Sequence, residues 1–190
     1  MSRVLAVDAL KGTHAGQTAW IVGKGPSIRY LKRADFGEGP VITINDSVAK
    51  VQLMEIENKI YSLQKDGYPE NMVRPGAGVT LILQYPYYSD GWFADHEPTL
   101  YVDPVGELGF QEATVMSIRM TIALAKIMGC TSINLMCCDS FFGDMATYDV
   151  IRDKLEGGSS GIYAAVIPLV RNDLEGVPHN FITPKKESDD

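Results

Sequence analysis

Residues 20–28, WIVGKGPSI, join a short apolar run to a turn that contains two glycines. Glycine lets backbone N–H groups approach an anion closely, and the start of a helix adds partial positive charge. Pro26 suits the first position of a helix, Ser27 adds a hydroxyl group, and Lys24 adds a mobile cation. The stretch therefore predicts a strand that leads into an anion-sized turn and then a helix.

The length and composition are those of one globular domain. The chain has 190 residues, of which 45% are hydrophobic and 22% are charged, as in folded domains with a substantial core. We expect a single domain over residues 1–183, with an aromatic loop at 84–98. A disordered tail is expected at 184–190, where charged residues follow a proline.

Net charge and cysteine content indicate which partners and which cellular compartment to expect. The formal net charge of −7 disfavours non-specific binding to nucleic acid. Three cysteines cannot form a complete disulfide framework, so buried thiols in a reducing compartment are predicted. The first residues lack a signal-peptide pattern, and no apolar run is long enough to cross a bilayer. We expect a cytoplasmic protein without a transmembrane segment, and homo-oligomerisation stays open.

Short apolar runs alternate with helical patterns along the chain. Strands are predicted at 4–7, 19–22, 41–44, 59–64, 79–83, 100–102, 132–137 and 162–167, and helices at 27–32, 47–55, 111–128 and 144–155. Near-continuous apolar strands separated by helices are typical of a parallel sheet that is covered on both faces. The predicted fold class is α/β, a Rossmann-like, mostly parallel sheet with helices on both faces.

Polar residues follow the predicted strands. In open parallel sheets, ligands bind beyond the carboxyl ends of the strands. Those ends carry Gly23–Ser27, Asn45-Asp46, Gln64–Asp66, Gln84-Tyr85 and Asp139-Ser140. The sequence therefore predicts a binding site along this edge of the sheet.

Several common sites do not fit the sequence. A dinucleotide fingerprint needs a third glycine, but Ile28 occupies its place and Pro26 is foreign to the pattern, although Asp46 stands near the position of the acidic residue. The P-loop pattern G-x-x-x-x-G-K-[ST] and the nucleophile elbow G-x-S-x-G do not occur. No histidine lies near the cysteines in sequence, so no zinc pattern is present either.

Two blocks of sequence resemble one known superfamily. The first contains the glycine turn, Gly23–Ser27, and the end of the next strand, Ile42–Asn45. The second runs from Thr114 through Met128–Cys130 to Ile133–Asp139. Together they resemble the bacterial sialyltransferase-like proteins of the glycosyltransferase family 42 type. They also resemble the related DUF115 domain of motility accessory factors and archaeal 6-hydroxymethylpterin diphosphokinases.

The resemblance implies a nucleotide-activated donor, typically an acidic sugar linked to cytidine monophosphate (CMP). The glycine turn would line the phosphate and the sugar, Asn45 would bind the nucleotide portion, and Asp139 with Ser140 and Phe141 would border the base and ribose. Polar residues at other strand ends and at a helix start complete the predicted nucleotide site. Its members are Gly23, Lys24, Gly25, Pro26, Ser27, Asn45, Asp46, Asp66, Thr114, Asp139, Ser140 and Phe141.

Transfer of a CMP-activated sugar needs a base for the acceptor hydroxyl and groups that support the leaving phosphate. His179 is the first candidate base, at a position broadly like that of the family's histidine, and His96 in the aromatic loop is the second. Three aromatic residues of that loop, Tyr87, Tyr88 and Trp92, either stack on a substrate or pack beneath the loop.

The sequence thus predicts a glycosyltransferase-like protein that transfers a sugar from a CMP-type donor to the hydroxyl of a small-molecule or glycan acceptor. No cofactor or metal is implied for that reaction. One alternative is a Mg²⁺-dependent diphosphokinase that acts on a pterin-like alcohol with ATP, with Asp66, Asp139 and Asp144 as possible metal ligands. The other alternative is a nucleotide-binding module without catalytic activity.

Overall fold

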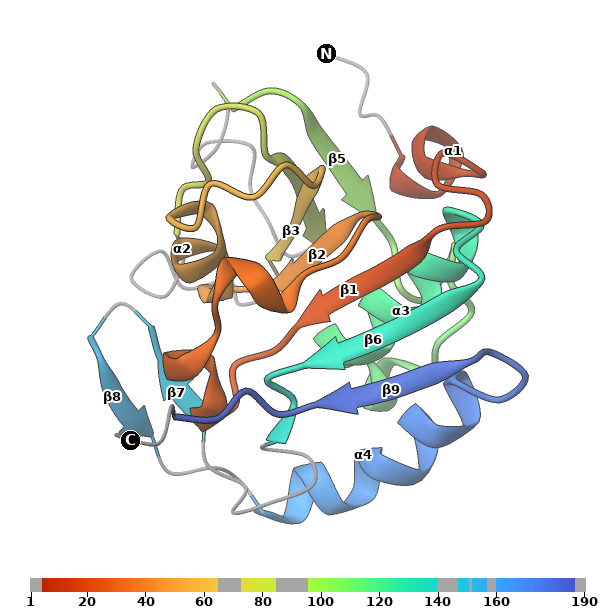
Figure 1. Cartoon of the computed structure of the whole chain (residues 1–190). Helices are drawn as coiled ribbons and strands as arrows, with labels where there is room; N and C mark the ends of the chain where they lie inside the picture. Colours follow the sequence, from red (N-terminus) through yellow and green to blue (C-terminus); the bar gives the residue numbers. More distant parts are fainter. Residues whose placement is uncertain are drawn as a thin grey trace.

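The computed structural model describes residues 5–64, 73–84, 96–139, 147–150, 152–156 and 160–186. Its centre is a seven-stranded sheet in which all neighbouring strands pair in parallel, in the order β5-β4-β3-β2-β1-β6-β9 (Figure 1). The strands are β1 (Thr18–Val22), β2 (Val41–Ile44), β3 (Ile60–Gln64), β4 (Thr80–Gln84), β5 (Thr99–Val102), β6 (Ser132–Met136) and β9 (His179–Ile182). The predicted Rossmann-like α/β fold is confirmed.

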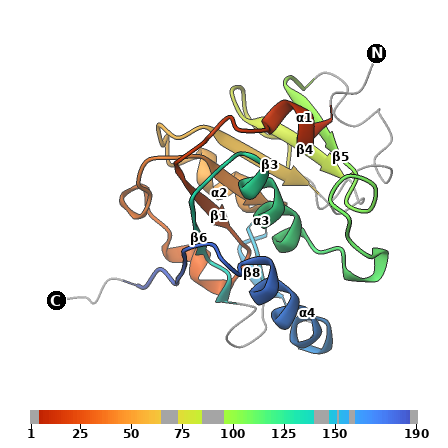
Figure 2. The same ribbon diagram turned by 90° about the vertical axis from the view of Figure 1, so that its right-hand side faces the viewer.

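Alternate side chains of the central strands enter two separate cores. Ile21 and Ile42 pack with the core on one face, which also contains residues of α1 (Ala6–Leu10), α3 (Ser117–Ile127) and α4 (Ser160–Asp173). Val22 and Val41 pack on the other face with Ile28 of the 3₁₀ helix η1 (Pro26–Tyr30) and with α2 (Ser47–Gln52). Figure 2 shows α3 and α4 together on one side of the sheet. Because both faces are covered, most residues of β1, β2, β3, β4 and β6 are buried, including polar ones such as Thr43 and Ser62.

The order of the strands reverses at β1. From β1 the chain adds β2, β3, β4 and β5 on one side, and it then returns to place β6 and β9 on the other side. In open α/β sheets, the crevice beyond the carboxyl ends of the strands at such a switch point is where ligands bind. The fold therefore directs attention to the carboxyl ends of β1 and β6.

Three sequence predictions about secondary structure were wrong. The predicted strand at 4–7 gives way to α1, because Ala6 and Leu10 lie on one helical face and bury against the core. The described part of the predicted helix at 144–155 forms an antiparallel hairpin of β7 (Thr147–Asp149) and β8 (Lys154–Glu156). The predicted strand at 162–167 lies within α4, where Val166, Val170 and Leu174 recur at helical spacing and are buried.

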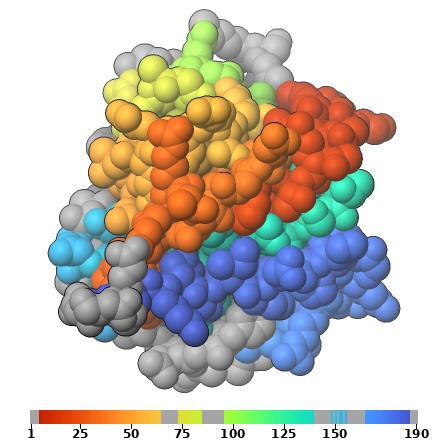
Figure 3. Space-filling model, viewed as in Figure 1, coloured from red at the N-terminus to blue at the C-terminus, as the bar shows by residue number. Residues whose placement is uncertain are grey.

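The helix predicted at 111–128 is shorter than expected. A 3₁₀ turn, η4 (Glu112–Thr114), precedes α3, and Gly129 ends the helix with a φ of 81°. The strand β9 was not predicted, because its residues are mostly exposed and follow a proline. Figure 3 shows it running along the surface as the outer edge of the sheet. Among the described residues, no helix combines the length and apolar character that a membrane span requires.

Candidate functional site at the topological switch point

A hydrogen-bonded pair of side chains joins the carboxyl ends of β1 and β6. The backbone N–H of Ser27 donates to Oδ2 of Asp139 at 3.0 Å, and the Ser27 hydroxyl donates to Oδ1 at 2.5 Å. Ser27 is buried in the first turn of η1. The anion held directly by this turn is therefore the protein's own carboxylate, which was not foreseen from the sequence.

The two glycines of the turn allow the ends of β1 and β6 to approach each other. Gly23 N–H donates to the Met136 carbonyl at 2.9 Å, and Gly25 N–H donates to the Cys137 carbonyl at 2.7 Å. A Cβ atom on Gly25 would lie 2.3 Å from Oδ1 of Asp139, and one on Gly23 would lie 2.7 Å from the Cys137 carbonyl oxygen. Because neither contact is sterically allowed, the requirement for glycine is explained by packing at the switch point.

Two non-glycine residues at the strand ends adopt left-handed backbone conformations. Asn45 follows β2 with a φ of 51°, and Cys137 follows β6 with a φ of 54°. Such conformations cost free energy and cluster at functional sites. The buried hydroxyl of Ser47 accepts a hydrogen bond from Ile44 N–H and donates one to the Val22 carbonyl. These two hydrogen bonds join the ends of β1 and β2.

Lys24 and Asp46 form an ion pair beside the glycine turn. Lys24 Nζ lies 2.7 Å from Oδ1 of Asp46, with side-chain exposures of 23% and 3%. Within the described ranges, this ion pair is the contact recorded for the buried Oδ1 atom, which has no further hydrogen-bond partner there. Burial raises the pKa of Asp46, and Lys24 and the N–H of Val150 oppose that rise. Asp46, which the sequence predicted as a member of the nucleotide site, therefore positions the Lys24 ammonium.

The hairpin β7–β8 is attached to the same turn. Tyr148 N–H donates to the Lys24 carbonyl at 2.7 Å, and Val150 N–H donates to Oδ2 of Asp46 at 3.0 Å. Sequence reasoning missed both contacts, because partners more than a hundred positions apart leave no local pattern. The hairpin, η1 and α2 enclose a hollow of about 480 Å³ that is described below.

Polar side chains also end the next two strands, as predicted. Gln64 Nε2 donates to the Asn45 carbonyl, the Ser62 hydroxyl and the Val73 carbonyl, so this amide holds the end of β3 to that of β2. The buried Oε1 atom of Gln84 lacks a hydrogen-bond partner within the described part of the chain. The carboxyl edge is thus lined with buried polar groups from β6 through β1 to β4.

The two candidate histidines lie at the opposite edge of the sheet. His179 is the first residue of β9, pairs in register with Ile133 near the start of β6, and is exposed. His96 is buried and donates from Nε2 to the carbonyl of Val79, which directly precedes β4. The structure therefore does not bring either imidazole together with Ser27 and Asp139.

Of the remaining predicted site residues, the structure describes only Thr114. Thr114 lies in η4, where its hydroxyl donates to the Gln111 carbonyl and its own carbonyl accepts from Arg119. These contacts are with the approach to α3 rather than with the glycine turn. Several predicted residues fall outside the described residues, namely Asp66, Tyr87, Tyr88, Trp92, Ser140, Phe141 and the alternative metal ligand Asp144.

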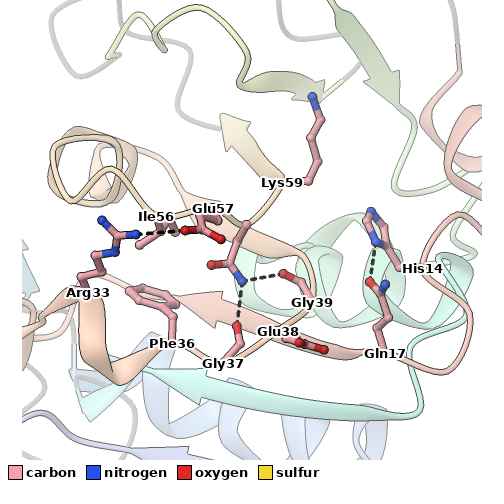
Figure 4. A pocket seen from close by; sticks show the side chains of 11 residues that line it. His14, Gln17, Arg33, Phe36, Gly37, Glu38, Gly39, Ile56, Glu57 and Lys59 are labelled. Carbon is pink, nitrogen blue, oxygen red and sulfur yellow. Dashed lines mark hydrogen bonds and ion pairs between the residues drawn. The ribbon is translucent and has the colours of Figure 1, made fainter.

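A second hollow, of about 500 Å³, opens at the edge where the strands begin (Figure 4). Its polar groups are largely engaged with one another. The amide of Asn58 donates to the carbonyls of Gly37 and Gly39, and the Arg33 guanidinium pairs with Glu57 at 3.3 Å. His14 is held by Gln17 and Tyr61. These contacts stabilise the loop before β2, and they leave this hollow a weaker candidate than the switch point.

The three cysteines lie in buried surroundings that suppress ionisation of their thiols. Burial raises the pKa of Cys130 to about 11 and that of Cys137 to about 12, and it also raises the pKa of Cys138. All three thiols are free and buried. Within the described ranges, no three His, Cys, Asp or Glu side chains are grouped so that they could hold a metal ion.

Comparisons with known proteins agree with the fold. No protein-family model matches the chain, and no curated protein matches it. The structure is similar to the crystal structure of a mammalian sialyltransferase in complex with Gal-β-1-3GalNAc-ortho-nitrophenol, with a TM-score of 0.50 and 8% sequence identity. The match covers 95% of this chain and 78% of the sialyltransferase chain. At that identity the similarity concerns the fold, and the chain has a sialyltransferase-like α/β fold.

Proposed function

We propose that the protein is a glycosyltransferase that binds a CMP-type nucleotide sugar in the crevice beyond β1 and β6 and transfers the sugar to an acceptor hydroxyl. The observation that carries the proposal is the pair formed by Ser27 and Asp139, which joins the carboxyl ends of β1 and β6 at the switch point of the sheet, where ligands bind in open α/β folds. The sialyltransferase-like fold supports the same reaction class.

Each group around the crevice has a role that follows from its chemistry. The carboxylate of Asp139 is only partly buried, and its oxygens have lone pairs beyond those used by Ser27, so it accepts hydrogen bonds from the ribose hydroxyls. The Lys24 ammonium, held by Asp46, stabilises the negative charge that develops on the leaving phosphate. Asn45, fixed in a left-handed conformation, presents its amide to the nucleotide.

The acceptor proton requires a base at the same edge of the sheet. His96 and His179, the bases predicted from the sequence, lie at the edge where the strands begin. We therefore assign neither of them a contact with the donor. This assignment makes His179→Ala a control variant whose affinity for CMP stays unchanged.

Isothermal titration calorimetry with CMP tests the proposal. Ser27→Ala and Asn45→Ala should each weaken CMP binding about tenfold, because each removes a group worth about 1.4 kcal/mol at the crevice. Circular dichroism confirms that the variants stay folded. Unchanged affinity in both variants, or an equal loss in His179→Ala, would show that the nucleotide does not bind there. Binding of ATP only with Mg²⁺ would instead favour the diphosphokinase.

A further inference from the structure

The hollow between η1, α2 and the β7–β8 hairpin has a lining that does not belong to the nucleotide crevice. Its walls combine apolar, cationic and hydroxyl-bearing side chains, namely Ile28, Arg29, Lys50, Tyr148, Val150, Asp153 and Leu155. A volume of about 480 Å³ falls within the range of small-molecule sites. Two hydrogen bonds, to Lys24 and Asp46, hold the hairpin beside the glycine turn. The hollow that the hairpin lines is therefore close enough to the proposed donor site to receive a second substrate.

Two cations give this hollow a positive rim on a chain of net charge −7. The Arg29 guanidinium lies 5.3 Å from the ring centroids of both Tyr30 and Tyr148, and its Nε donates to the Pro26 carbonyl. Stacking and this hydrogen bond restrict the plane of the guanidinium, and its terminal nitrogens make no hydrogen bond within the described part of the chain. Lys50 lies in the last turn of α2. In the described part of the chain, neither cation forms an ion pair with another residue.

The β7–β8 hairpin offers groups that suit the rest of a sugar. The hydroxyl of Tyr148 donates to the Asp153 carboxylate, which raises the pKa of Tyr148 and holds that carboxylate at the wall. Asp153 is exposed, so its free lone pairs can accept hydrogen bonds from sugar hydroxyls. Leu155, whose side chain is 55% exposed, presents apolar surface to the C–H face of a sugar ring.

We propose that this hollow is the acceptor site and that it binds a sugar carrying a carboxylate or a phosphate group. The anion lies between Arg29 and Lys50, and the hydroxyls of the sugar face Asp153. The hollow and its charged residues are observed whatever reaction the protein catalyses, but the role of acceptor site rests on the proposed transferase function.

Titration followed by ¹H–¹⁵N NMR spectroscopy tests the site, with D-glucose 6-phosphate, D-glucuronate and uncharged D-glucose as probes. At least one of the charged sugars should shift the amide signals of Tyr148, Val150 and Leu155, and glucose should not. The stronger of the two charged probes identifies which anion the site prefers. Equal binding of glucose, or no binding of either charged sugar, would overturn the proposal.

A matched pair of variants localises the anion. Lys50→Gln and Lys126→Gln each remove one lysine from the last turn of a helix, and only Lys50 lines the hollow. Lys50→Gln should raise the dissociation constant at least fivefold, Arg29→Gln should do the same, and Lys126→Gln should leave it unchanged. An equal effect of Lys126→Gln would show that only net charge matters, and the site would be rejected.

The nucleotide is titrated separately, so that the two proposals fail in different ways. Binding of CMP without binding of any charged sugar would reject the acceptor site and leave the proposed donor crevice standing. Binding of a charged sugar without CMP would keep an anionic-sugar site and reject the proposed transferase. Signals from the amide groups of Ser27 and Asp139 report the first event, and those of the hairpin report the second.

Discussion

Ser27 and Asp139 are 112 positions apart in the chain, and two hydrogen bonds hold them together at the point where the strand order reverses. The contact joins the segments that follow β1 and β6, two paired strands that no hairpin or short loop connects. It depends on Gly25, which packs against both the Asp139 carboxylate and the backbone of Cys137. The geometry of the candidate site therefore rests on one small residue.

Replacement of Gly25 by alanine should damage both the fold and the site. The added Cβ would lie 2.3 Å from Oδ1 of Asp139 and 2.8 Å from the carbonyl oxygen of Cys137, and the second of these is backbone that cannot rotate away. Overpacking of this kind costs about 1–3 kcal/mol. Urea denaturation followed by circular dichroism should show that decrease in the free energy of unfolding, and CMP binding should weaken in parallel.

Gly76→Ala is the matched control for this prediction. The nearest atom to its added Cβ would be Oε1 of Gln52 at 3.6 Å, which is an ordinary van der Waals contact. We expect the free energy of unfolding to change by less than about 0.5 kcal/mol. A loss in Gly25→Ala no larger than that in Gly76→Ala would contradict the close packing at the switch point.

Substitution of Asp46 by asparagine should alter the pH dependence of stability. Burial raises the pKa of this carboxyl above its ordinary value of 3.8. Between that value and the raised pKa, the folded state binds more protons than the unfolded state, so stability from this group falls as pH rises through the window. The loss of stability caused by ionising Asp46 is complete above its pKa in the folded state and absent below about pH 3.8.

The measurement compares Asp46→Asn with the unaltered protein by urea denaturation at several pH values from about 4 to about 7. The variant has no carboxyl to ionise at this position, so its free energy of unfolding should fall less, or rise more, over that range. Lys24 is partly exposed and reaches solvent when its partner is removed. Parallel curves for the two proteins would show that the pKa of Asp46 is not raised.

Local sequence signals predicted the fold class and the central strands of the sheet. The strand at 41–44 matched β2 at both ends, because four consecutive apolar or β-branched residues with both faces buried leave little ambiguity. The polar residues after β1, β2, β3, β4 and β6 were predicted to gather at one edge, and the parallel pairing places their strand ends there. Because parallel strands all end at the same edge of the sheet, residues that follow each strand in the sequence lie along that edge, and their gathering there could be predicted.

The parts that failed depend on contacts between distant segments. The run at 162–167 is apolar enough for a strand, and only the packing of α4 against α3 reveals a helix. Asp46 occupies the N-cap position of α2, but its carboxylate makes no capping hydrogen bond and instead contacts Lys24 and Val150, which no local pattern predicts. His179 was chosen for its position after Asp139 and His96 for its place in the aromatic loop, and neither criterion shows at which end of the strands the imidazole lies.

The ion pair between Arg119 and Asp173 should be the most important one for stability among those in the described ranges. Arg119 Nε and Nη2 donate to the two oxygens of Asp173 at 2.5 and 3.0 Å, and the side chains are only 9% and 14% exposed. Asp173→Ala leaves the buried guanidinium without its counter-ion between α3 and α4. We expect a loss of about 3–5 kcal/mol in the free energy of unfolding, measured by urea denaturation.

The exposed pair of Arg33 and Glu57 provides the comparison. Their side chains are 58% and 91% exposed and approach only to 3.3 Å, so solvent screens the interaction. Glu57→Ala should change stability by less than about 0.5 kcal/mol. Similar losses in Glu57→Ala and Asp173→Ala would show that burial does not determine the contribution of these pairs.

The three thiols should resist modification in the folded protein. Burial raises the pKa of Cys130 to about 11 and that of Cys137 to about 12, so very little thiolate is present at about pH 8. We expect reaction with 5,5′-dithiobis(2-nitrobenzoic acid) to be at least about a hundredfold slower than in guanidinium chloride, where all three thiols are exposed. Fast reaction of the folded protein would contradict their burial.

The same reaction distinguishes local from global opening of the switch point. Cys137 and Cys138 follow β6 beside the glycine turn, whereas Cys130 lies at the other end of that strand. If Gly25→Ala separates β1 from β6, modification followed by mass spectrometry should find Cys137 and Cys138 labelled before Cys130. Equal labelling of all three would indicate global unfolding. Because the close contact is confined to the carboxyl end of β6, we expect the ordered result.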